Sequence, residues 1–213
     1  MPYGYIGQNL PNQTVSNSGV FSISDVADLE KQGKFGGSLE LIEEQTVSGV
    51  SAVDFTSIKE NVYDVHLLQW SGIYLASATA NYLEIRLSNN GGTSYINSGY
   101  QYAQQYVGTN GSFGEIKSTS ADAIEKISFS ATENELYTQN SYVYLYNLGN
   151  SSKYSFATFH SFSSATSTAN WGYFGGGVQP TAEVHNAIKV FSDAGTNFSG
   201  TIKLYGVKQI WVT

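Results

Sequence analysis

From residue 38 onward, apolar and polar residues alternate with a period of two along most of the chain. In residues 82–87 Tyr, Glu and Arg alternate with Leu, Ile and Leu, and residues 202–205 repeat the pattern as Ile-Lys-Leu-Tyr. This period places successive side chains on opposite faces of a β-strand. The helical period is convincing only once, in residues 24–33. The chain is therefore predicted to be an all-β protein.

The alternating segments are short and are separated by residues that form turns at little conformational cost. Asn-Asn-Gly-Gly at 89–92, Thr-Asn-Gly-Ser at 109–112 and Gly-Gly-Gly at 175–177 are examples. About ten strands are predicted, near 38–46, 50–55, 62–71, 81–88, 99–107, 125–130, 140–148, 154–163, 183–192 and 200–212. Many short strands with almost no helix predict an antiparallel β-sandwich or jelly roll. No repeat of fixed period is visible, which disfavours a propeller or a solenoid.

The N-terminal 37 residues differ from the rest. Residues 1–22 contain two of the three prolines, several glycines and spaced aromatic residues, a composition typical of an extended arm. In residues 24–33, Ser24 can cap a short helix that Gly33 can end. We therefore predict two parts, an arm with one short helix at 1–37 and a β-sandwich domain at 38–213.

Composition excludes several classes of partner. The 213 residues carry 10 Lys and Arg against 17 Asp and Glu, a net charge of −7, so no cationic face is expected to bind nucleic acid. No apolar run is long enough to cross a bilayer, and we expect no membrane insertion. The first basic residue is Lys31, so a Sec-type signal peptide is not expected either.

No pattern of catalytic or metal-binding residues stands out. The chain has no cysteine, and the motifs of common hydrolases, P-loop proteins and EF-hands are missing. His66, His160 and His185 fall on three different predicted strands. The segment 88–95 resembles an Asp-box hairpin with Asn90 in the usual Asp position, and we interpret it as a structural turn. We predict a protein that is not an enzyme and has no cofactor, no metal and no catalytic residue.

The most informative side chains are aromatic. Tyr142, Tyr144 and Tyr146 share one face of a predicted strand, and Trp171, Tyr173 and Phe174 stand beside the glycine run. Flat, partly polar rings stack on sugars and are also common in protein interfaces. Three interpretations stay open for these six residues: burial between two sheets, contact with another subunit, and glycan binding.

Several segments resemble proteins of tailed bacteriophages. Tyr5-Ile6-Gly7, the run from Gly19 to Val26 and Gly33-Lys34-Phe35 are similar to the N-terminal segment of tail-fibre and other virion structural proteins, especially of marine phages. The segments from Glu84 to Tyr95 and from Gly200 to Val207 resemble the β-sandwich domains of that family.

The resemblance implies a non-enzymatic structural component of the virion, tail-fibre-like, that is exposed on the particle after assembly in the host cytoplasm. It implies contact with other virion proteins and a homo-oligomer, with a trimer favoured, and possible binding of host cell-surface polysaccharide. A capsid decoration or head-fibre protein and a stand-alone carbohydrate-binding module are the alternatives. The expected anchoring residues in the arm are Tyr3, Tyr5, Ile6, Leu10 and Phe21.

Deletion of residues 1–22 should leave the sandwich folded and abolish assembly. The apolar residues of the arm are too many for an idle tail, yet its prolines and glycines prevent an independent core. Circular dichroism should report unchanged β-structure, while sedimentation should report loss of the oligomer or particle. A truncated chain that assembles normally would show that the arm is not the anchor.

Overall fold

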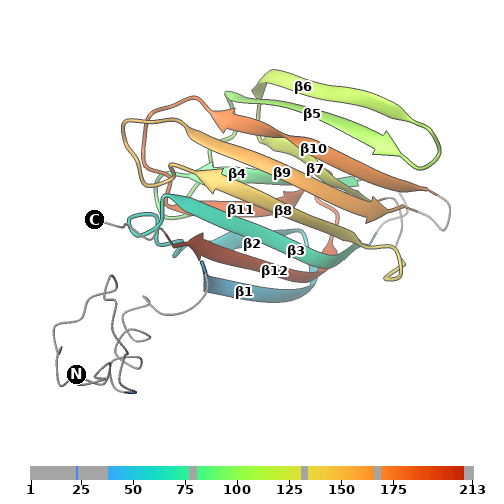
Figure 1. The fold of residues 1–213 in the computed structure, drawn as a ribbon, viewed down its shortest axis with the longest axis horizontal. Coiled ribbons are helices and arrows are strands. Elements are labelled where there is room, and N and C mark those ends of the chain that lie inside the picture. The colour runs from blue at the N-terminus through green and yellow to red at the C-terminus, as the bar shows by residue number, and fades with distance from the viewer. Residues whose placement is uncertain (1–22, 24–37, 77–80, 131–133, 166–168, 209–213) are drawn as a thin grey trace, which may run out of the picture. The chain divides into compact units, whose positions relative to one another are not determined.

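The computed structural model describes residues 23, 38–76, 81–130, 134–165 and 169–208. The chain divides into two units, of which Leu39–Val207 is the first. The first unit is an all-β antiparallel sandwich, which confirms the predicted fold class (Figure 1). The predicted arm at 1–22 and helix at 24–33 lie outside the described residues. No helix in the described ranges is both long and apolar enough to span a membrane.

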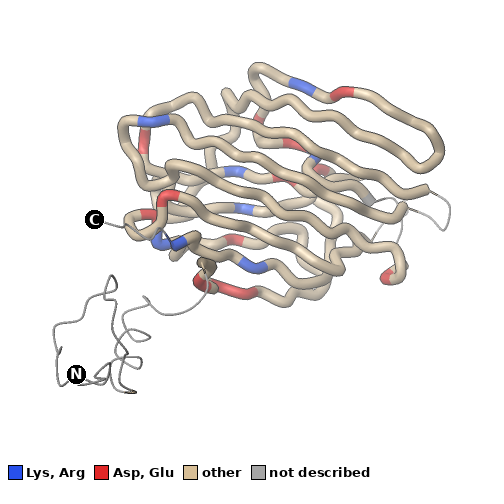
Figure 2. Tube along the Cα trace, in the orientation of Figure 1, with Lys and Arg blue, Asp and Glu red and all other residues tan. Residues whose placement is uncertain are grey.

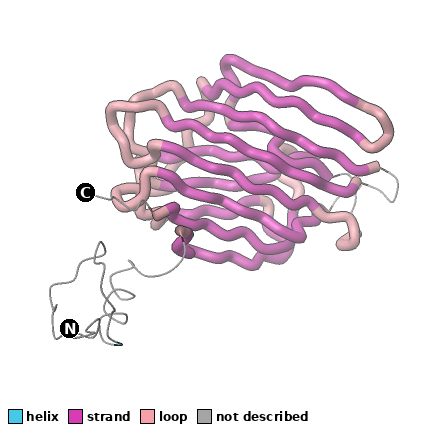
Figure 3. The backbone as a smooth tube through the Cα atoms, viewed as in Figure 1, coloured by secondary structure: helices cyan, strands magenta, loops and turns pink. Residues whose placement is uncertain are grey.

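Twelve strands form within the described residues, in two sheets of unequal width (Figure 3). The wide sheet has the order β1-β12-β3-β8-β9-β10-β5-β6, and the narrow sheet has the order β2-β11-β4-β7. The strands are β1 (Leu39–Val50), β2 (Ala52–Phe55), β3 (Val65–Leu75), β4 (Asn81–Ser88), β5 (Tyr100–Gly108), β6 (Phe113–Ala121), β7 (Ile124–Ser130), β8 (Gln139–Tyr146), β9 (Ser155–Ser164), β10 (Asn170–Gln179), β11 (Ala187–Ser192) and β12 (Phe198–Val207).

The core lies between the facing sides of the two sheets. Its largest fully buried side chains are Trp70, Tyr100, Phe55 and Phe198, surrounded by Leu, Ile and Val residues from both sheets. The indole N–H of Trp70 donates to the Ser128 hydroxyl at 3.1 Å, so the ring is buried with its polar atom satisfied. Burial of these rings supplies the main drive for the two sheets to associate.

Strand β7, at one edge of the narrow sheet, packs over β8, β9 and β10 of the wide sheet. The inward side chains of β9 are small with the exception of Phe159: in the sequence SFATFHSFSS, the buried positions are Ser, Ala, Phe, Ser and Ser. The Ser161 hydroxyl donates to the backbone oxygen of Ile127 at 2.7 Å. A Cβ added to Gly177 would lie only 3.1 Å from the Ile124 side chain. Small inner residues thus allow a close approach of β7.

Ten of the twelve strands overlap the predicted ones, and two were missed. The interpretation of Gly175–Gly177 as a turn is wrong, because these residues form the middle of β10 and pair with β9 on one side and β5 on the other. Strand β6 was missed because Ile116 is the one aliphatic residue between Phe113 and Ala121, too weak an apolar signal. Both errors lie where packing, not residue propensity, selects the strand.

A Gly175→Ala substitution should destabilise the sandwich. The new Cβ would lie 2.4 Å from the Ala103 backbone oxygen and 2.5 Å from the Gln104 Cβ, so the paired strands must separate. The free energy of unfolding should fall by about 1–3 kcal/mol, the usual cost of overpacking. Urea unfolding measures it.

Gly172→Ala is the matched control in the same strand. Its Cβ would meet its nearest side-chain atom at 3.4 Å and its nearest backbone atom at 3.8 Å. Its free energy of unfolding should stay level or rise by about 0.4–1 kcal/mol, because alanine restricts the unfolded chain. Equal losses for the two variants would contradict the packing argument.

Candidate binding face

The wide sheet has one face toward the narrow sheet and one face turned away from it, which we call the open face. Cross-strand partners point to the same side of a sheet, so the register places Tyr142, His160 and Phe174 together on the open face. Several large apolar side chains on it stay exposed: Leu39, Leu41, Val107, Phe113, Tyr142, Phe156, Phe162 and Phe174. Exposed apolar side chains gathered on one face make the open face the candidate binding surface.

Aromatic rings run across the centre of the open face in a connected row. Tyr146 stacks on Tyr144 with ring centroids 6.4 Å apart, and Tyr144 contacts Tyr142 edge-on at 6.1 Å. Tyr142 contacts His160 at 5.7 Å, and His160 contacts Phe174 at 6.5 Å. The row therefore crosses from β8 through β9 to β10. We call these five side chains the aromatic row.

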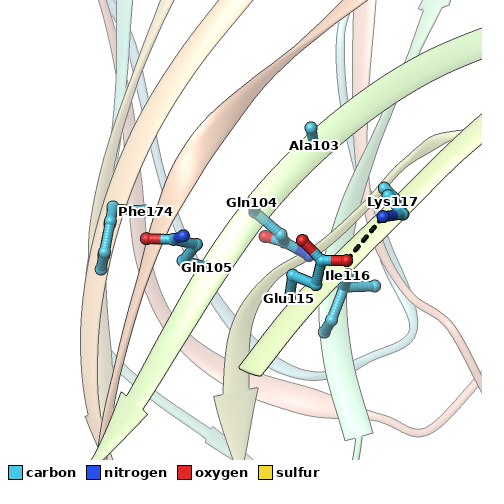
Figure 4. Close-up of a pocket in the computed structure, with 7 residues that line it drawn as sticks. All are labelled: Ala103, Gln104, Gln105, Glu115, Ile116, Lys117 and Phe174. Atoms are coloured by element: carbon cyan, nitrogen blue, oxygen red, sulfur yellow. Dashed lines mark hydrogen bonds and ion pairs between the residues drawn. The ribbon is translucent and has the colours of Figure 1, made fainter. Parts of the chain in front are cut away.

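The aromatic row ends beside a shallow depression of about 240 Å³. It is lined by Ala103, Gln104, Gln105, Glu115, Ile116, Lys117 and Phe174 (Figure 4). Small residues make room for it, since Ala103 on β5 pairs directly with Gly176 on β10. An exposed ring next to an amide and a carboxylate can hold a partly polar, partly apolar ligand.

The open face has ion pairs and no cluster of one charge. Glu115 and Lys117 on β6 pair at 2.5 Å, and Glu44 on β1 pairs with Lys203 on β12 at 3.1 Å (Figure 2). Each pair is neutral as a unit. A ligand or partner that meets the aromatic row therefore meets little net charge.

The structure separates the six aromatic residues singled out from the sequence. Tyr142, Tyr144, Tyr146 and Phe174 lie on the open face, so burial between two sheets is excluded among the three interpretations left open for them. Tyr173 points to the opposite side, where it is 3% exposed. The hypothesis that Tyr173 contacts a glycan or another subunit is therefore wrong, because the ring is almost completely buried.

Trp171 shares the inner side of β10 with Tyr173 and is partly buried. Its ring lies 5.8 Å from Tyr106 and 5.8 Å from Phe129, within a cluster that also holds Tyr82. The grouping of Trp171 with Phe174 as one surface fails because three residues along a strand reverse the side. Trp171 belongs to the packing at the end of the sandwich.

Sequence reasoning missed Phe156, Phe162 and His160 of β9, which all lie on the open face. Their alternation with serine and alanine was visible, yet large apolar residues are ordinarily assigned to the core. The predicted anchoring residues Tyr3, Tyr5, Ile6, Leu10 and Phe21 lie outside the described residues.

The polar side chains considered for chemistry have structural partners. His66 is buried with Nε2 2.8 Å from the Ile58 oxygen, and the buried His185 has Nδ1 2.7 Å from the Ser155 hydroxyl. Burial lowers the pKa of both histidines. His160 lies apart from them on the open face, and no three His, Cys, Asp or Glu side chains in the described ranges gather to hold a metal ion.

The hairpin at 88–95 is held by its own hydrogen bonds. The Ser94 N–H donates to Asn90 Oδ1 at 3.0 Å, and the Gly92 N–H donates to the Ser88 hydroxyl at 3.0 Å. Asn90 thus accepts the backbone hydrogen bond that a carboxylate would accept in an Asp-box. This arrangement is consistent with a structural turn.

Comparison of the chain with protein-family models, with curated proteins and with solved structures finds no match in any of the three.

One buried carboxyl gives a pH-dependent test of the packing. Glu84 on β4 is 5% exposed, and burial, followed by the charges of Glu125, Asp193 and Asp122, raises its pKa from 4.5 to about 8. Between these values the folded chain holds a proton that the unfolded chain releases, so the free energy of unfolding should fall as pH rises. Urea unfolding at about pH 7 and about pH 9 measures the fall, above the range in which the buried His66 and His185, whose pKa values burial lowers, make stability rise with pH.

Glu84→Gln should flatten this pH dependence, because the amide does not titrate. An equally steep fall in the Gln variant would show that another group causes it.

Proposed function

We propose that the chain is a non-enzymatic structural component of a phage virion, tail-fibre-like, that binds a host surface polysaccharide through the open face. The phage assignment rests on the resemblance of the N-terminal segment and of the sandwich segments to virion proteins. The observation that carries the binding role is the aromatic row, in which rings on three neighbouring strands stay accessible. The residues before 38 serve as the anchor in this proposal.

Polysaccharide suits the open face for a chemical reason. The rings of Tyr142 and Phe174 are 44% and 40% exposed, so a sugar ring can stack on either of them with few side-chain rotors to immobilise. Gln105, beside Phe174 in the depression, offers an amide donor and acceptor to sugar hydroxyls (Figure 4). The two ion pairs leave the face near neutrality, which suits a neutral glycan.

A role as a stand-alone carbohydrate-binding module uses the same face and is the second candidate. The depression beside Phe174 favours it, since a ring, an amide and a carboxylate line it together. Negative-stain images of candidate phages labelled with an antibody against this chain distinguish the two. Label on tails or capsids supports the virion role, and unlabelled particles support the module.

Tyr142→Ala and Phe174→Ala should each weaken adsorption to host polysaccharide by about 5-fold to 150-fold. That range corresponds to about 1–3 kcal/mol for the burial of one ring. The melting temperature should change little, because both rings are exposed in the free sandwich. Adsorption and melting temperature must be measured on the same preparations.

Leu136→Ala is the control, since Leu136 is a 79% exposed apolar residue in a turn away from the sheets. It should leave adsorption unchanged. Unchanged adsorption in both aromatic variants would reject the glycan site. A loss of the oligomer in those variants, with adsorption per particle unchanged, would assign the open face to subunit contact.

A further inference from the structure

Strand β6 is one edge of the wide sheet, and its outer side has no strand partner among the described residues. It pairs with β5 in continuous register from Phe113↔Val107 to Ser118↔Tyr102. An edge of this kind presents unpaired backbone N–H and C=O groups to any chain that can continue the sheet.

The backbone groups that point outward can be identified. The Gly108 N–H donates to the Ser112 oxygen at 2.7 Å, which makes Gly108 and Ser112 a hydrogen-bonded pair. Because such pairs alternate along an antiparallel ladder, Gly114, Ile116 and Ser118 bond to β5. The backbone groups of Phe113, Glu115 and Lys117 therefore face the free side.

The other three edges are less suited to pairing. Strand β1 has register shifts between Leu41 and Glu43 and between Val47 and Val50, which break it into short pieces. Strand β2 has four residues, and β7 is irregular where Lys126 adopts a φ of 56°. Bulges and short length are common protections of sheet edges. From Phe113 to Ser118, β6 has neither of these two protections, and its one lysine, Lys117, is paired with Glu115.

We propose that β6 pairs with β6 of a second copy of this chain, antiparallel, about a two-fold axis at Ile116. In this register Glu115 lies opposite Lys117 of the second copy, and Lys117 lies opposite its Glu115. The outward backbone groups of both residues then form the inter-chain hydrogen bonds, and Ile116 faces Ile116 as a non-hydrogen-bonded pair. The inference gives an interface to the homo-oligomer that the resemblance implies, and it predicts a dimer where the resemblance favours a trimer.

Charge selects this register among its neighbours. A shift of the axis by one residue to Glu115 or to Lys117 would place like charges opposite each other, which is destabilising. In the single chain, Glu115 and Lys117 pair along the strand with side chains 64% and 67% exposed. Residues at i and i+2 of one strand, such as Glu115 and Lys117, have Cα atoms about 7 Å apart. The Cα atoms of a hydrogen-bonded cross-strand pair are about 5.5 Å apart. Ion pairs between the two chains can therefore replace the ion pair within each chain without a loss of electrostatic stabilisation.

Pairing at β6 would also place the two open faces side by side. Glu115 and Lys117 lie on the open face of each sheet, because they pair with Gln105 and Ala103. Partners across an antiparallel ladder share a side, so the two wide sheets become one. The two depressions beside Phe174 then adjoin the axis.

The first test reverses one charge at a time in the full chain. Glu115→Lys and Lys117→Glu each place like charges opposite each other, and each should raise the dimer dissociation constant about tenfold or more. Sedimentation velocity measures the constant. An equimolar mixture of the two variants should regain a dimer, because each then meets the opposite charge. Both side chains are exposed, and a melting temperature equal to that of the original chain checks the fold.

The second test traps the register, using the fact that the chain has no cysteine. In Ile116→Cys the two sulfur-bearing residues would have Cα atoms about 4.5 Å apart, within the range for a disulfide. Oxidation should yield a covalent dimer on a non-reducing gel. Ser118→Cys is the matched control on the same side of β6. Its symmetry mate would be about 14 Å away along the strands, so it should stay monomeric on the gel.

The proposal would be overturned if the original chain is monomeric at about 100 µM. It would also be overturned if the single charge reversals leave the sedimenting mass of the dimer unchanged, or if both cysteine variants cross-link equally. A trimer or larger closed ring would overturn it too, since the two-fold pairing uses one edge of each copy. All these measurements are made without glycan. A negative result for the dimer therefore does not bear on the glycan site. The adsorption of the aromatic variants tests the glycan site and does not bear on the dimer.

Discussion

The close approach of β7 to the middle of the wide sheet is the constraint on which the rest of the sandwich depends. The Ser161 hydroxyl bonds to the Ile127 oxygen, and Trp70 bonds to Ser128, so β7 is held to β9 and β3 by polar contacts inside the core. Such contacts need small residues beneath them, and Gly177 on β10 meets that need. Buried hydroxyls without these partners would each cost free energy.

This constraint has a consequence for the opposite side of the sheet. Because serine and alanine occupy most of the inner positions of β9, its large side chains Phe156, His160 and Phe162 occupy the outer ones. The row from Tyr146 to Phe174 continues this arrangement on the neighbouring strands. The apolar surface of the open face is thus the counterpart of a tightly packed interior. The proposed glycan site uses the open face, and the proposed dimer uses the edge at β6.

Prediction from the sequence succeeded where the alternation is strong and both sheets contribute. Strand β4 was predicted at 81–88, which are also the bounds in the structure, because Leu83, Ile85 and Leu87 mark its inner side. It failed at β10, whose glycines have turn propensity yet are required by the closeness of Ala103 and Ile124. At Tyr173 the sequence left burial, subunit contact and glycan binding open, and the register placed the ring inside.

The sequence by itself determined the class of the fold, the number of strands to within two, and the presence of exposed aromatic candidates, because a period of two is a local property of the backbone. The tertiary structure alone decided which of the two alternating sets of side chains on each strand faces the core. That choice depends on what lies across the sheet: β7 above Ser161 excludes a phenylalanine there, and no described strand lies above Phe162. Strand order likewise arises from contacts between distant segments, so the edge position of β6 and the joining of Tyr142, His160 and Phe174 emerge only in the folded chain.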